Sequence, residues 1–233
     1  MKIFNEFGIK PTTNCKAAGY DFYIPNIKVP IDNCDYILNA FSASYKKTKE
    51  ELTEILNNLV LYATAQYGEK PINGNELNIL FLYLALDSTA LHVVDDPYEI
   101  FIDHYLIFDE KNNVPGIKPR VLDHVFFNSG IHVALEPNTV GIFFNKSGRG
   151  IKGWDIRACV IDEDYAGAVH LSLAYTKLND DDGIIYCGDK LTQMVVLPVL
   201  HSEIEEVEEE DYNEIMSNSE RGSNAFGSSD EKH

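Results

Sequence analysis

The stretch VFFNSGIHVALEPNTVGIFF, residues 125–144, decides the class of fold. Short apolar runs alternate there with the turn-forming groups NSG (residues 128–130) and EPN (residues 136–138). Gly, Pro and Asn favour turns because they adopt or fix backbone angles that strands do not use. Two more apolar runs, residues 169–173 and 194–197, follow turns that contain Asp and Gly. Closely spaced strands of this kind predict a mainly β fold, a jelly-roll-like barrel.

A different periodicity, typical of helices, fills the middle of the chain. The segment TKEE, residues 48–51, fits a capping box, in which hydroxyl and carboxylate each bind a free amide of the first turn. Apolar residues then recur at helical spacing over residues 52–63, and Gly68 supplies a stop. A second helix is predicted at residues 75–86, where the sequence is apolar almost all round, which indicates burial.

Composition divides the chain into segments. Residues 203–211 hold seven acids, and a like-charge block of this kind is usually a solvated, extended linker. The Gly- and Ser-rich end that follows is typical of a flexible terminus. We expect a β core at residues 1–25 and 118–200, a mostly helical insert at 26–117, an acidic linker at 201–220 and a flexible end at 221–233. The insert is interpreted as outer packing, with an oligomer contact or a docking surface for a protein partner as the alternatives.

Composition also excludes several classes of protein. The 233 residues are 45% hydrophobic and 24% charged, which rules out collagen-like and wholly disordered chains. Nineteen basic against 37 acidic residues give 19 − 37 = −18, and such a field repels nucleic acid. Four cysteines without a CxxC pair argue against zinc and fit a reducing setting. No apolar run is long enough to be a signal peptide or a membrane span, so we expect a cytoplasmic protein.

Four short segments carry residues capable of chemistry. Ser147 stands among two glycines and two cations, in a loop whose amides can approach an anion; an ordinary basic turn is the alternative. Asp162 follows an apolar pair that indicates a buried strand, which makes it a candidate general base; a solvated hairpin tip is the alternative. Asp189 and Gln193 flank the entry to an apolar strand, where they can also serve the backbone alone.

The Gly-rich tail contains two unexpected side chains. Arg221 and Phe226 could fold over a ligand by pairing with a phosphate and stacking on a ring.

Taken in order, five segments resemble the five motifs of the trimeric dUTPase family. These are AAGYD (residues 17–21), KSG (146–148), VIDEDYAG (160–167), GDKLTQ (188–193) and RGSNAFGS (221–228). The resemblance covers residues 10–25 and about 118–229, and it points to a diverged member, phage-like or bacterial-like, with a helical insert. A viral member would work in the host cytoplasm.

The resemblance implies hydrolysis of dUTP to dUMP and pyrophosphate, with Mg²⁺ on the triphosphate and no direct protein ligand to the metal. Asp162 would activate the water that attacks the α-phosphorus, and Tyr165 would pack against the deoxyribose. Asp21 and Asp189 would line the site. The remaining expected contacts to substrate are Lys146, Ser147, Gly148 and Gln193.

The resemblance also assigns the base and the lid. Uracil would be read by the backbone of a hairpin that contains Ile156 and Ala158. The tail would close over the site: Phe226 would stack on the uracil, Arg221 and Ser228 would reach the terminal phosphates, and Gly227 would also contact the substrate. The family is homotrimeric, with each site built from three chains.

Two other functions remain open. A dCTP deaminase of the same superfold places a Glu where Ser172 stands here. A regulatory binding protein would use the same fold and the insert to hold a partner, because fold alone does not prove activity.

Overall fold

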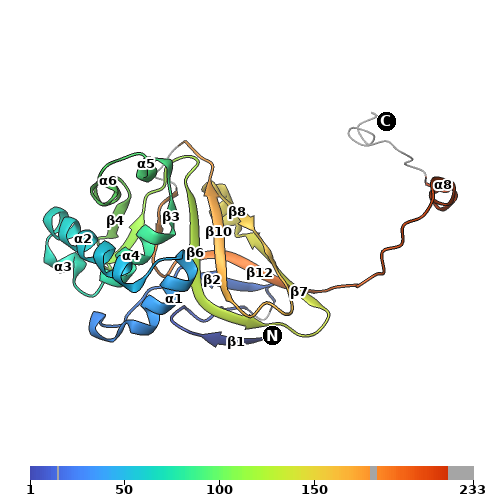
Figure 1. The fold of residues 1–233 in the computed structure, drawn as a ribbon, viewed down its shortest axis with the longest axis horizontal. Helices are drawn as coiled ribbons and strands as arrows, with labels where there is room; N and C mark the ends of the chain where they lie inside the picture. Colours follow the sequence, from blue (N-terminus) through green and yellow to red (C-terminus); the bar gives the residue numbers. More distant parts are fainter. Residues whose placement is uncertain (15, 179–182, 220–233) are drawn as a thin grey trace. The chain divides into compact units, whose positions relative to one another are not determined.

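The computed structural model describes residues 1–14, 16–178 and 183–219 (Figure 1). The chain divides into two compact units, Met1–Val199 and Leu200–His233. No helix within the described ranges is both long and apolar enough to cross a membrane.

Two antiparallel sheets form the β core of the larger unit. The first has the order β1-β6-β10-β8, with β3 also paired to β6, and the second has the order β2-β12-β7-β9. The strands of the first sheet are β1 (Lys2–Asn5), β3 (Leu86–Asp87), β6 (His124–Ala134), β8 (Trp154–Ala158) and β10 (Ala168–Tyr175). Those of the second are β2 (Tyr20–Tyr23), β7 (Thr139–Asn145), β9 (Val160–Ile161) and β12 (Lys190–Pro198). The fold is therefore mainly β, a jelly-roll-like barrel with helices inserted after β2.

The helices of residues 31–104 lie together on one side of the strands in Figure 1. They are the short η1 (Ile31–Asn33), α1 (Asp35–Tyr45), α2 (Lys49–Tyr67), α3 (Glu69–Ile72), α4 (Glu76–Ala85), α5 (Thr89–His92) and α6 (Pro97–His104). The predicted capping box is present, since Glu51 N donates to Thr48 Oγ1 over 3.1 Å and Thr48 N donates to the Glu51 carboxylate. Gly68 ends α2 with φ of 80°, a backbone conformation that favours glycine.

A small third sheet connects the helical segment with the site described below. It has the order β11-β5-β4, with β4 (Leu106–Asp109), β5 (Val114–Ile117) and β11 (Ile185–Tyr186). The sequence interpretation missed these strands. They pair the end of the helical segment with the residues directly before β12.

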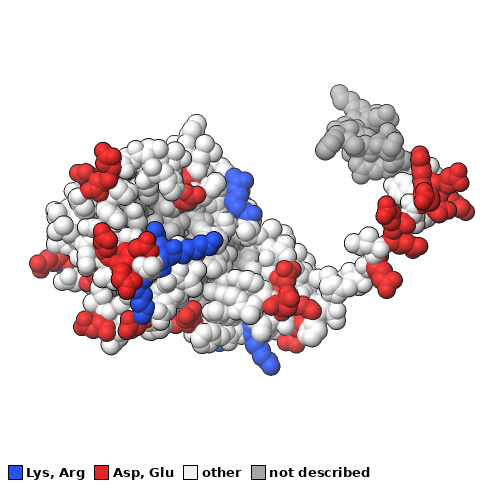
Figure 2. Space-filling view, in the orientation of Figure 1, with Lys and Arg blue, Asp and Glu red and all other residues white. Residues whose placement is uncertain are grey.

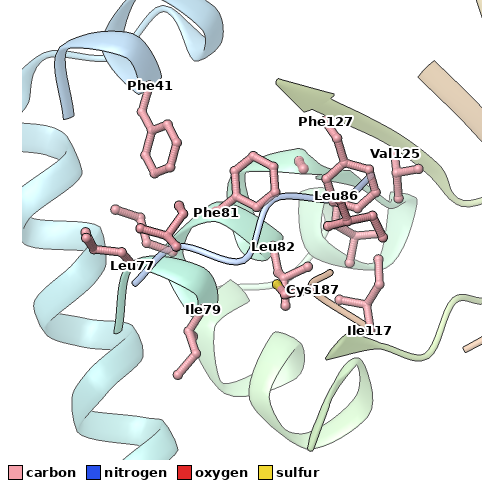
Figure 3. Packing of buried hydrophobic residues seen from close by; sticks show 14 of the residues in the cluster. Phe41, Leu77, Ile79, Phe81, Leu82, Leu86, Ile117, Val125, Phe127 and Cys187 are labelled. Atoms are coloured by element: carbon pink, nitrogen blue, oxygen red, sulfur yellow. The ribbon is translucent and has the colours of Figure 1, made fainter. Parts of the chain in front are cut away.

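The helices and the β core share one hydrophobic interior (Figure 3). Phe81 of α4 packs against Phe41 of α1 and Phe127 of β6, with ring centroids 5.6 and 5.4 Å apart. A polar contact adds to this apolar packing. The fully buried Asn78 side chain accepts from Ile27 N over 2.7 Å and donates to Ile27 O over 3.1 Å, much as a neighbouring strand would.

Three sequence expectations are wrong in detail. Residues 128–130 do not form a turn, because β6 runs through them. Gly130 N donates to Asn128 Oδ1 and Ile131 N to Ser129 Oγ, so side chains supply partners where the pairing with β10 is irregular. The strand before Asp162 is not buried, since Val160 is 58% exposed.

The third difference lies in the smaller unit. Its acidic segment was expected to be extended, yet it contains helix α8 (Glu209–Met216), whose side chains are all exposed. Three acids in the first turn favour this helix, because negative charge is stabilised near a helix N-terminus.

Candidate active site

A cavity of about 340 Å³ lies where β7, helix α7 (Ser147–Ile151) and the start of β12 meet. Strand pairing brings these segments together, because Gln193 of β12 lies opposite Phe144 of β7. The lining of this cation pocket consists of Lys146, Ser147, Gly148, Arg149, Lys152, Lys190 and Gln193. Four residues expected to contact the substrate, Lys146, Ser147, Gly148 and Gln193, are thus side by side.

Asp21 bridges two lysines of the cation pocket. It lies on β2 opposite Gln193, and its carboxylate is 2.5 Å from Lys146 Nζ and 2.9 Å from Lys190 Nζ. Partial burial by itself would raise the pKa of Asp21, but hydrogen bonds and charge from the two ammonium groups outweigh burial and lower it. Asp21 is therefore ionised at neutral pH and restrains both amino groups.

Arg149 is engaged with the turn before β12. Its guanidinium lies 2.8 Å from the carboxylate of Asp189, and its Nε donates to the carbonyl of Lys190 over 3.0 Å. Asp189 in turn accepts from the amide of Tyr186 over 2.9 Å. Arg149 and Asp189 therefore hold this turn against α7.

The net charge of the cation pocket is opposite in sign to that of the protein. Four cations line or border it and two carboxylates pair with them, which gives 4 − 2 = +2. The whole chain carries −18, and acidic side chains outnumber basic ones on the face drawn in Figure 2. The pocket is a local positive site on an acidic protein, which suits a small polyanion.

Asp162 and Tyr165 lie at the other end of β7. Val160 and Ile161 of β9 pair with Ile142 and Gly141, so the exposed Asp162 follows at the level of Val140. Lys146 follows Asn145 at the opposite end. Val140 and Asn145 are five positions apart, about 17 Å along a strand that rises about 3.3 Å per residue. Within one chain, the candidate base and the cation pocket are therefore apart.

Tyr165 is 39% exposed and bonded to its own loop. Its hydroxyl donates to the carbonyl of Ala168 over 2.8 Å, and its amide donates to the carbonyl of Asp162 over 3.2 Å. The ring lies directly over Gly167, where an added Cβ would come 2.5 Å from the Tyr165 hydroxyl oxygen. Only glycine fits at that position without a shift.

The hairpin expected to read the base begins beside the cation pocket. Asn145 accepts from the amide of Ile156 over 2.9 Å and donates to Asp155 over 2.9 Å. Ile156 and Ala158 lie on β8 and pair with Leu173 and Ser172 of β10. Asn145 thus ties this hairpin to the end of β7.

Sequence reasoning missed Lys152, Lys190 and Asn145. Lys190 stands inside the quoted segment GDKLTQ, so its charge was the signal that could have found it. The expected tail residues lie outside the described residues: Arg221, Phe226, Gly227 and Ser228.

The described residues contain no cluster of three His, Cys, Asp or Glu side chains suited to a metal. The two carboxylates at the cation pocket, Asp21 and Asp189, are both paired with cations. The residues present therefore fit a divalent cation that arrives with a phosphate ligand better than one held by protein carboxylates.

Comparison with known proteins gives the family. Residues 116–230 match the dUTPase family model. A deoxyuridine 5'-triphosphate nucleotidohydrolase of Hydrogenobaculum sp. is 31% identical over 112 residues, covering 47% of this chain and 72% of that protein. The chain belongs to the dUTPase family.

Other relatives are longer than the matched region. The Gag-Pro-Pol polyprotein of simian retrovirus SRV-1 is 30% identical over 116 residues, which are 50% of this chain and 6% of the polyprotein. The chain spans less than two thirds of the length of this polyprotein and of several other curated relatives that it matches. Among solved structures, the Staphylococcus bacteriophage 80alpha dUTPase with dUPNHPP is 20% identical, with 53% of this chain and 90% of that chain covered and a TM-score of 0.41.

Proposed function

We propose that this protein is a dUTP diphosphatase, which hydrolyses dUTP to dUMP and pyrophosphate. The observation that carries the proposal is the cation pocket, in a chain that belongs to the dUTPase family. Ser147 and Gln193 bind phosphate oxygens there, and Lys146, Lys152 and Lys190 supply positive charge. A fully ionised triphosphate with one Mg²⁺ carries a net charge of about −2, which complements the +2 of the pocket.

The proposed chemistry needs positioning and charge neutralisation more than covalent help from the protein. Asp162 accepts a proton from a water molecule as that water attacks the α-phosphorus, and the pyrophosphate leaves toward the cations. A Mg²⁺ ion carried on the triphosphate would supply positive charge opposite the leaving oxygens, beside the charge of Lys146, Lys152 and Lys190. Asp21 and Asp189 hold the cations in place and ligate no metal.

Tyr165 and the β8 hairpin recognise the nucleoside in this proposal. The Tyr165 ring packs against the deoxyribose and excludes a 2′-hydroxyl, while backbone groups near Ile156 and Ala158 pair with uracil. The tail residues Arg221, Phe226, Gly227 and Ser228 are assigned by the family resemblance to closing over the nucleotide.

We further propose that the active form is a homotrimer with shared sites. The support comes from the separation of about 17 Å along β7 between the levels of Asp162 and Asn145. Reacting atoms must come within about 3 to 3.5 Å, so Asp162 of one chain serves the cation pocket of another. An exposed Asp162 is accessible to such a partner.

The direct test is pyrophosphate release from dUTP with Mg²⁺, using wild-type protein and Asp162→Asn. The wild type should turn over dUTP, and the variant should lose at least about a hundredfold in kcat while it still binds a non-hydrolysable dUTP analogue, because general-base catalysis contributes about 10² to 10⁴. Asp103→Asn, at an exposed position of α6, is the matched control and should behave as wild type.

Two outcomes would replace the proposal. Ammonia release from dCTP without cleavage of dUTP would indicate the deaminase, although Ser172 of β10 offers no carboxylate there. Tight nucleotide binding without turnover would indicate a regulatory binding protein.

A further inference from the structure

Two histidines bind the loop that carries Asp162 and Tyr165. His132 lies on β6 and His170 on β10; Nδ1 of His132 contacts a backbone carbonyl of that loop, and Nδ1 of His170 contacts the carbonyl of Ala168, the residue where the loop enters β10. The distances are 3.1 Å from His132 Nδ1 to Ala166 O and 2.9 Å from His170 Nδ1 to Ala168 O. A carbonyl oxygen only accepts, so Nδ1 carries the proton in both rings.

The bond from His170 leads directly to Tyr165. The Ala168 carbonyl accepts both the Tyr165 hydroxyl, over 2.8 Å, and His170 Nδ1. His132 holds Ala166, the next residue after Tyr165. The tyrosine is thus fixed by hydrogen bonds to both sides of the tight bend at Gly167.

Both imidazoles are themselves held in place. The His170 ring stacks on Phe126, with centroids 4.5 Å apart and planes 12° apart. The His132 ring packs against Phe4, and its Nε2 lies 3.4 Å from the carboxylate of Glu6. This packing fixes the position of each ring, so the Nδ1 donors of both histidines are held rigidly.

Packing alone does not fix Tyr165. The residue lines two cavities, of about 450 and 420 Å³. A side chain bordered by open space keeps rotamer freedom unless hydrogen bonds restrict it. The bond from the Tyr165 hydroxyl to the Ala168 carbonyl supplies that restriction, and the two histidines hold the carbonyls of Ala166 and Ala168 in place.

We propose that His132 and His170 are positioning residues that fix the Tyr165 loop and thereby set the discrimination between deoxyribose and ribose nucleotides. This inference rests on the proposed function of Tyr165. Neither histidine touches substrate; each acts through a backbone carbonyl. A loosened loop would let the tyrosine ring retreat and admit a 2′-hydroxyl, so UTP would become a better substrate relative to dUTP.

The test compares Asn and Gln at each position. The Asn amide nitrogen occupies the place of Nδ1 and keeps the donor, whereas the Gln nitrogen occupies the place of Nε2 and loses it. We expect His132→Gln and His170→Gln to lower the ratio of kcat/KM for dUTP to that for UTP by about two- to tenfold, the size of one hydrogen bond. The Asn variants should keep the ratio, as should His124→Gln, an exposed position on β6.

Hydrogen exchange of residues 162–170 in the nucleotide-free protein gives a second measurement that does not need activity. The Gln variants should exchange faster there, with the rest of the chain unchanged, and the Asn variants should match wild type. Equal ratios and equal exchange in the Asn and Gln variants would overturn the inference. Wild-type protein that cleaves neither nucleotide would refute the proposed function, while the exchange measurement would still decide whether the histidines hold the loop.

Discussion

Asp21 shows what a single residue contributes to the cation pocket. The sequence placed it at the site by resemblance, but not its contact with Lys190. That contact depends on the register between β2 and β12, which are about 170 residues apart in the chain. Residue types in a motif indicate chemistry, whereas partners across a sheet depend on long-range pairing that no local pattern encodes.

Substitution of Asp21 tests its role. Asp21→Asn removes the charge that holds two amino groups, so both lysines should become mobile and repel each other. We expect kcat/KM for dUTP to fall about ten- to hundredfold, the range for misplaced binding groups. Steady-state kinetics measure this, with Asp32→Asn, exposed in η1, as the control. An unchanged kcat/KM would show that the lysines need no carboxylate.

His170 gives a prediction for stability against pH. Burial lowers the pKa of this imidazole from its usual 6.5, and the hydrogen bond to Ala168 offsets only part of this shift. Below about pH 6.5 the unfolded chain therefore takes up a proton that the folded chain does not, and the free energy of unfolding falls. Denaturant titrations at pH 7.5 and 5.5 should show a smaller loss for His170→Asn than for wild type. The same loss in both would contradict the assignment.

At the scale of elements, local signals worked where one segment satisfies its own backbone. Helix α2 begins at the capping box and ends at Gly68, as the sequence predicted, because residues nearby in the chain close both of its ends. The NSG group at residues 128–130 misled for the opposite reason. Its turn propensity was overridden by pairing of β6 with β10 and β1, which only the folded sheet supplies.

Asn78 joins helix α4 to the connecting segment at Ile27 that follows β2, and its removal has a predictable cost. Asn78→Leu leaves the amide and carbonyl of Ile27 without their partner. We expect the free energy of unfolding to fall by about 1–3 kcal/mol for each buried group that finds no replacement. Chemical denaturation measures the change, and Asn57→Leu, at an exposed position of α2, should be nearly neutral. Equal stability of both variants would show that water replaces the amide.

For the whole molecule, the sequence predicted a set of site residues but not how far apart the fold places them within one chain. Motifs follow each other along the chain, yet Asp162 and the cation pocket lie at opposite ends of β7. Strand direction and register determine this separation, and both emerge only from the complete sheet.

Shared sites can be tested by mixing two inactive variants. Asp162→Asn lacks the base and Gln193→Ala lacks a phosphate contact, so each alone should be nearly inactive. Mixed oligomers prepared by co-expression should regain about one quarter of wild-type activity, the chance that an intact Asp162 meets an intact pocket in a symmetric ring. Sedimentation would establish the trimer in the same samples. No recovery in verified mixed oligomers would mean that each chain builds its own site.

The common interior of Phe41, Phe81 and Phe127 limits how this protein can be re-engineered. Deleting the helices to obtain a minimal version of the protein would expose the apolar face of β6 that they cover, and an exposed apolar surface of this kind promotes aggregation. The helices would not be stable when transferred to another protein, because their own apolar face would lose its partner on β6. The helices and the β core therefore depend on each other for stability, so heating should unfold them in a single transition.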